Sequence, residues 1–123
     1  MEAREGLDVG IETLAGEYLG GISLFRILPV DHNAELGIVI GNKDQWGKGH
    51  ATEAMELIID YGFKELNLHM IYLMVVSFNS RAETIYRRLG FVEEGTLRQR
   101  IYRDGAYHDL ISLSLLRSEW EAR

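Results

Sequence analysis

A glycine-containing loop separates a short apolar run from a helical pattern, and this succession restricts the fold more than any other feature. The loop covers residues 44–52 and includes Gly47, Gly49 and Ala51. The first turn of a helix has N–H groups without intrahelical acceptors and carries the positive end of the helix dipole, so it can hold a phosphate. The spacing fits neither the P-loop nor the dinucleotide-binding pattern. On spacing alone, a plain tight turn before a helix remains an equal alternative.

The residues on either side of this loop predict three strands and a helix. Segments 9–14 and 18–27 are rich in strand-favouring side chains and flank a glycine turn, so they predict a hairpin. A third strand is predicted at 34–40. From 51 to 66 the apolar residues recur every three or four positions, which is the period of a helix with one buried face.

A strand and a second helix are predicted next. The nearly continuous apolar run at 70–78 is typical of a strand buried on both faces. Ser80 and Glu83 have the spacing of a capping box, and Gly90 is a suitable stop for the helix that begins there.

The remaining residues predict a hairpin. Segments 91–102 and 107–115 alternate in character, Gly95 predicts an irregularity, and Asp104-Gly105 is a strong turn signal between them. The whole pattern predicts an α/β (α+β) fold, with a mixed, mostly antiparallel twisted sheet of about six strands and two main helices. We expect one domain over residues 1–123.

Composition excludes several classes of protein. The chain has no cysteine, so disulfides, thiol catalysis and zinc–thiolate sites are excluded. No leader and no apolar run of membrane-spanning length occur, so we expect a cytoplasmic protein. The formal net charge of −6 argues weakly against nucleic acid and is compatible with a cationic substrate. No His/Asp/Glu spacing typical of a metal site is present, and we expect no metal.

Five segments in a fixed order resemble the GNAT superfamily of acetyl-CoA-dependent N-acetyltransferases. Within it, the chain is most similar to the branch of ribosomal-protein N-terminal and spermidine acetyltransferases. The resemblance runs from about Val9 to Trp120. The segments are 46–54 (WGKGHATEA), 60–63 (DYGF), 66–68 (LNL), 79–82 (NSRA) and 85–91 (IYRRLGF).

The resemblance implies an acetyl-CoA site around the glycine loop. The family's pyrophosphate-binding loop falls on this stretch, with Trp46 standing where Gln or Arg is usual. The preceding strand would offer its main chain to the pantetheine amides. The implied coenzyme contacts are Ile38, Val39, Ile40, Trp46, Gly47, Lys48, Gly49, His50, Ala51 and Thr52.

The second helical motif supplies further implied contacts. Asn79 would bind the pantetheine arm, and Tyr86 would lie near the thioester sulfur as general acid for the departing thiolate. From the residues alone, the favoured interpretation is that Asn79 is an N-cap and Tyr86 a core aromatic. Arg81 and Arg87 are candidates for the coenzyme phosphates, with solvated side chains as the alternative.

Glu35 is the candidate general base, because family members place a carboxylate near this point. The alternative is an ordinary exposed carboxylate on a strand. Met74 stands where some relatives carry a glutamate, so that other base is absent here.

The beginning of the chain differs from the family pattern. Family members usually have a strand and two helices before the first hairpin, and this chain opens almost directly on the hairpin. We therefore expect exposed apolar surface that a second copy covers, giving a homodimer or a higher oligomer. The expected function is acetyl transfer to a primary amine, a cationic one in view of the net charge. The alternative is a truncated, non-catalytic domain that binds acetyl-CoA or a protein partner.

Overall fold

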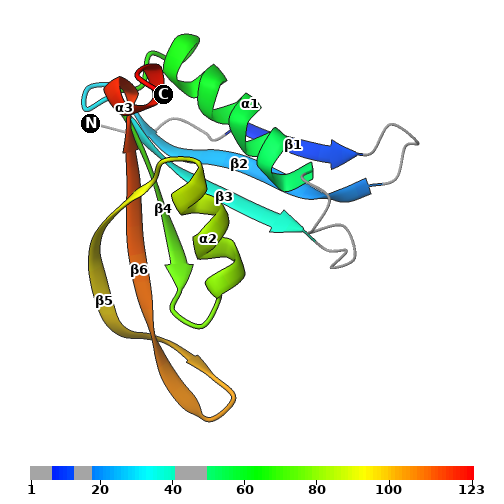
Figure 1. The fold of residues 1–123 in the computed structure, drawn as a ribbon, viewed down its shortest axis with the longest axis vertical. Coiled ribbons are helices and arrows are strands. Elements are labelled where there is room, and N and C mark those ends of the chain that lie inside the picture. Colours follow the sequence, from blue (N-terminus) through cyan, green and yellow to red (C-terminus); the bar gives the residue numbers. More distant parts are fainter. Residues whose placement is uncertain (1–6, 13–17, 41–49) are drawn as a thin grey trace. The chain divides into compact units, whose positions relative to one another are not determined.

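The computed structural model describes residues 7–12, 18–40 and 50–123, which form two compact units divided after Ile71. Figure 1 shows the elements in chain order. None of the described helices is long and apolar enough to cross a membrane. The described elements are β1 (Leu7–Glu12), β2 (Tyr18–Leu28), β3 (Asn33–Ile40), α1 (His50–Lys64), β4 (Met70–Val76), α2 (Ser80–Arg88), β5 (Val92–Arg103), β6 (Ala106–Leu116) and α3 (Arg117–Glu121).

The first unit contains an antiparallel meander and helix α1. β2 pairs with β1 on one side and with β3 on the other, as the sequence predicts. Gly62 lies where α1 approaches β2, and a Cβ there would be 3.2 Å from Leu24 Cδ1. The absence of a side chain at Gly62 therefore allows the close contact. The buried apolar residues that form this core include Leu24, Leu36, Met55, Ile59 and Phe63.

A bulge interrupts the pairing of β2 with β3. Phe25 pairs with Glu35 and Leu28 with Asn33, so Arg26 and Ile27 together oppose Ala34. Arg26 has a φ of 52°, in the left-handed region that residues other than glycine seldom adopt. The sequence does not predict this bulge, because no glycine marks it.

The second unit contains a hairpin joined to most of β4. β5 and β6 are antiparallel, and β4 lies beside β6. The Ser77 amide donates a hydrogen bond of 2.9 Å to the Asp109 carbonyl. At the turn, Asp104 and Gly105 have φ values of 53° and 78°, which suits the two-residue turn predicted from Asp-Gly.

Two irregularities interrupt the hairpin. One falls between Glu93 and Gly95, where the sequence predicts it. At the other, Leu97 pairs with Leu110 and Ile101 with His108, so three residues of β5 oppose the single residue Asp109. The second irregularity is not predicted by the sequence.

Helix α2 ends in a Schellman motif. The Gly90 amide donates to the Arg87 carbonyl at 3.0 Å, and the Phe91 amide donates to the Tyr86 carbonyl at 3.1 Å. Gly90 has a φ of 105°, which confirms its predicted role as the stop of this helix. The motif fixes where the chain leaves the helix.

Three details differ from the sequence-based predictions. β4 is not buried on both faces: Ile71, Leu73 and Val75 are buried, whereas the alternate residue Met74 is exposed. The continuous apolar sequence of β4 therefore forms a strand with only one fully buried face. The five-residue helix α3 was not predicted. It begins after Leu116, whose amide donates to the Glu119 carboxylate at 2.9 Å.

The C-terminal cap of α2 gives a stability prediction. Gly90→Ala places a Cβ on a backbone with a φ of 105° and 3.4 Å from Leu115 Cδ1. We expect the free energy of unfolding to fall by ~1–2 kcal/mol, measured by urea denaturation. Gly95→Ala is the matched control, because a Cβ at Gly95 meets no atom within 4 Å, and its effect should stay within ~0.5 kcal/mol. Equal losses in the two variants would contradict this explanation.

Candidate active site

Tyr86 occupies the last turn of α2 and is held by the cap that follows it. Its side chain is 8 % exposed, and its ring lies edge-on to Phe91 with ring centroids 6.3 Å apart. Phe91 is also the residue whose amide bonds the Tyr86 carbonyl, so backbone and side chain are fixed by the same neighbour. An apolar contact between these two positions commonly accompanies the Schellman motif.

The environment of Tyr86 keeps its hydroxyl protonated. Burial raises the pKa of Tyr86 above its ordinary value of 10.0, because removal from water disfavours the phenolate. The hydroxyl has no hydrogen-bond partner among the described residues. A neutral, unpartnered O–H is able to donate a proton to a ligand atom brought close to it.

Asn79 is the N-cap of α2. Its Oδ1 accepts a hydrogen bond of 3.2 Å from the Ala82 amide. The predicted capping box of Ser80 and Glu83 is wrong, because the helix begins one residue earlier than that pattern requires and Glu83 turns to Arg87 instead. The side-chain NH₂ of Asn79 has no partner among the described residues, and this group is the one that could meet an amide carbonyl of a ligand.

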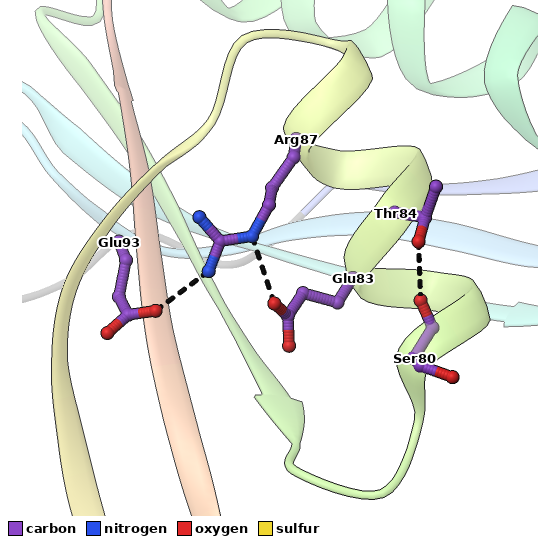
Figure 2. A network of polar contacts seen from close by, with 5 residues as sticks. All are labelled: Ser80, Glu83, Thr84, Arg87 and Glu93. Carbon is purple, nitrogen blue, oxygen red and sulfur yellow. Dashed lines mark hydrogen bonds and ion pairs between the residues drawn. The ribbon is translucent and has the colours of Figure 1, made fainter.

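Arg87 is engaged by two carboxylates, as Figure 2 shows. Its Nε donates to Glu83 at 2.9 Å and its Nη2 to Glu93 at 2.7 Å, which links α2 to β5. These hydrogen bonds raise the pKa of Arg87, the bond to Glu93 contributing most. The guanidinium is therefore less suited to a coenzyme phosphate than the sequence indicates. Arg81 is exposed and forms no ion pair with a described residue.

Glu35 lies in β3, in the first unit, beside the bulge at Arg26. Its side chain is 13 % exposed, and Oε1 lies 3.5 Å from Nη1 of Arg26. Oε1 is buried and has no hydrogen-bond partner in the part of the chain that the structure describes. The alternative of an ordinary exposed strand carboxylate is thus wrong. A buried oxygen without a donor is able to accept a proton or a hydrogen bond from a ligand.

The predicted coenzyme contacts are only partly described. Ile38, Val39 and Ile40 lie in β3 and pair with β2, and His50, Ala51 and Thr52 begin α1. The helix that was expected directly after the glycine loop is confirmed. The positions of Trp46, Gly47, Lys48 and Gly49 lie outside the described residues.

The described residues contain no group of three His, Asp or Glu side chains that could hold a metal ion. Sequence reasoning missed Arg26 as the partner of Glu35, and it missed the irregular segment of β5 at 98–100. No residue type marks either position in the sequence. Their geometry depends on pairing with a neighbouring strand.

The cap of α2 gives a prediction that separates stability from ligand binding. Asn79→Ala removes the oxygen that accepts from Ala82, so the free energy of unfolding should fall by ~1 kcal/mol in urea denaturation. Asn79→Asp keeps a capping oxygen and should retain the stability. If the Asn79 amide also binds pantetheine, both variants lose acetyl-CoA affinity in calorimetry. An equal loss of stability in both variants would show that the cap is not the cause.

Comparisons with known proteins show the family and the fold of this chain. A family model of the acetyltransferase (GNAT) domain matches residues 1–92. The putative ribosomal N-acetyltransferase YdaF of Bacillus subtilis (strain 168) is 37 % identical over 116 residues, which are 94 % of this chain and 62 % of that protein. The spermidine N(1)-acetyltransferase of Escherichia coli (strain K12) is 40 % identical over 107 residues, 87 % of this chain and 57 % of that protein. The chain thus spans about three fifths of the length of these curated relatives.

Solved structures show the same fold. The spermidine N-acetyltransferase of Vibrio cholerae, in a complex with CoA and spermine, matches with a TM-score of 0.88 and 32 % identity. The match covers 96 % of this chain and 69 % of that chain. The predicted mixed, mostly antiparallel fold is therefore confirmed, and the chain belongs to the GNAT acetyltransferase family.

Proposed function

We propose that this protein transfers an acetyl group from acetyl-CoA to a primary amine. The observation that carries the proposal is Tyr86, a buried side chain at the end of a capped helix, whose hydroxyl has no hydrogen-bond partner among the described residues. Family membership supports acetyl-CoA as the donor, as does the CoA bound in the Vibrio cholerae relative. Because the chain spans only part of its relatives' length, their activities are a guide for it rather than a description.

The proposed reaction is direct attack of the amine on the thioester carbonyl. A C–N bond forms, the C–S bond breaks, and the nitrogen loses a proton while the sulfur gains one. Tyr86 gives its proton to the departing thiolate, which avoids releasing a free anion into a partly buried site. Positioning of the two substrates supplies much of the remaining rate.

Glu35 is the proposed acceptor of the proton that leaves the amine, directly or through water. Its buried Oε1 accepts no hydrogen bond from a described residue, and Nη1 of Arg26 lies 3.5 Å from it.

The proposed donor site combines main-chain groups with the glycine loop. Ile38, Val39 and Ile40 would offer backbone groups to pantetheine, and Asn79 would offer its side-chain NH₂. The loop before α1, from Trp46 to Gly49, would hold the pyrophosphate together with the first amides of the helix. The start of α1 at His50 supports this part of the proposal, because it puts helix N–H groups directly after the loop.

The proposal specifies the acceptor only as a primary amine. The relatives' names point to a polyamine or to a ribosomal protein. The net charge of −6 favours a cation, so spermidine is the first small amine to test. The cytoplasmic location and the homodimer or higher oligomer stay predictions of the sequence.

Acetyl-CoA binding by calorimetry, followed by thiol release with spermidine, aminoglycosides and peptide N-termini, tests the proposal. We expect binding and amine-dependent release of CoA. Binding without release on any amine would favour the non-catalytic alternative.

Substitution of Tyr86 tests the mechanism. In Tyr86→Phe the ring and its contact with Phe91 are kept while the proton is lost, so kcat should fall by ~10²-fold or more with little change in acetyl-CoA affinity. Glu35→Gln should lower kcat at neutral pH in the same way. An unchanged kcat in Tyr86→Phe would remove this residue from the mechanism.

A further inference from the structure

The unpredicted irregularity of β5 forms an open pocket of about 550 Å³. The residues that line it are Arg98, Gln99, Arg100 and Asp109, which are the three bulged residues of β5 and the single residue that opposes them on β6. The pocket is therefore a product of the bulge itself. Bulges of this kind often redirect side chains beside a functional site.

The backbone of the pocket is held in a strained conformation. Gln99 has a φ of 53°, which is unfavourable for a residue with a side chain. The Gln99 amide donates to Oδ1 of Asp109 at 2.8 Å, and the Asp109 carbonyl accepts from the Ser77 amide at 2.9 Å. Asp109 thus ties the bulge to the end of β4. Strain that is held by specific contacts is more typical of binding sites than of ordinary hairpins.

The charges of the pocket do not balance. Arg98 and Arg100 are exposed and form no ion pair with any described residue. Asp109 offers the only carboxylate among the lining residues, and one of its oxygens is already used by Gln99. The pocket therefore has a formal charge of about +1 in a chain whose net charge is −6.

A singly charged oxyanion suits this arrangement. Guanidinium groups bind carboxylates and phosphates through paired hydrogen bonds. The Asp109 carboxylate would repel a doubly charged phosphate more strongly than a carboxylate, and it leaves one positive charge to be matched. A polycation such as spermidine is the least suitable occupant of a pocket with two unpaired arginines.

The pocket also belongs to the unit that carries the proposed acid. The Asp109 carbonyl accepts a hydrogen bond from the Ser77 amide. Ser77 lies shortly before Asn79, which is the N-cap of α2, the helix that carries Tyr86. We propose that Arg98 and Arg100 bind a carboxylate carried by the amine acceptor. The preferred acceptor is then a peptide N-terminus followed by an acidic residue. This inference rests on the proposed acetyl transfer.

Matched peptides test the inference. Two peptides that differ only in Asp or Asn near a free N-terminus are compared as acceptors, and kcat/KM is measured for each. We expect the wild-type protein to prefer the Asp peptide on the order of tenfold. In the double variant Arg98→Gln/Arg100→Gln the ratio should fall to about one, with kcat/KM for the Asn peptide almost unchanged. Arg103→Gln, an exposed arginine of the same strand outside the pocket, should keep the preference.

The possible results separate this inference from the proposed function. Turnover of both peptides at equal rates, or a preference that survives in the double variant, would contradict carboxylate binding by the pocket. Either result would leave the proposed acetyl transfer intact. If neither peptide is acetylated, binding is followed by NMR in the presence of CoA. Shifts at residues 98–100 and 109 with the Asp peptide alone would then support the pocket, and identical spectra with both peptides would overturn it.

Discussion

The contact between Tyr86 and Phe91 is the interaction on which the proposed chemistry depends. The Phe91 amide bonds the Tyr86 carbonyl, and the two rings meet edge-on. This cap is possible because Gly90 adopts a φ that a larger residue would resist. A helix end without it would let the last turn fray, and the hydroxyl would gain water and lose the burial that raises its pKa above 10.0. One turn of backbone thus determines both the position and the burial of the proposed acid.

Each of the two units presents a polar group that has no hydrogen-bond partner among the described residues, beside a distorted backbone or a helix end. In the first unit the buried Oε1 of Glu35 lies beside the bulge at Arg26. In the second, the hydroxyl of Tyr86 lies at the end of α2. Buried polar groups normally have partners, so the buried Oε1 of Glu35, which has none among the described residues, is most naturally explained by a substrate.

The two bulges show how distortions of a strand change the positions of charged side chains. At Arg26 the distortion brings a guanidinium next to Glu35, and at Gln99 it opens a pocket between two arginines. In both cases a residue other than glycine adopts a left-handed backbone. Regular pairing would instead place these side chains alternately on opposite faces of the sheet.

Local signals in the sequence predicted most of the fold. Apolar periodicity located α1, Asp104-Gly105 located the hairpin turn, and Gly90 located the end of α2. These features depend on neighbouring residues alone. The bulges at Arg26 and Gln99 depend on pairing with β3 and β6, so no local pattern could reveal them. Helix α3 has five residues, which are too few for an apolar period to mark it. For the site, the family resemblance implied that Tyr86 is the general acid. Only the structure shows what holds Tyr86 in place, namely the Schellman motif and the ring contact with Phe91.

The rate of acetyl transfer as a function of pH tests the central claim most directly. A peptide acceptor is suitable, because its α-amine titrates near ~8 and the rate should reach a plateau above that pH. Since burial raises the pKa of Tyr86 above 10.0, and since only the protonated form donates, kcat should stay on this plateau to beyond pH 10 before it falls. A fall below pH 10 that disappears in Tyr86→Phe would show that Tyr86 ionises too easily and would contradict the account.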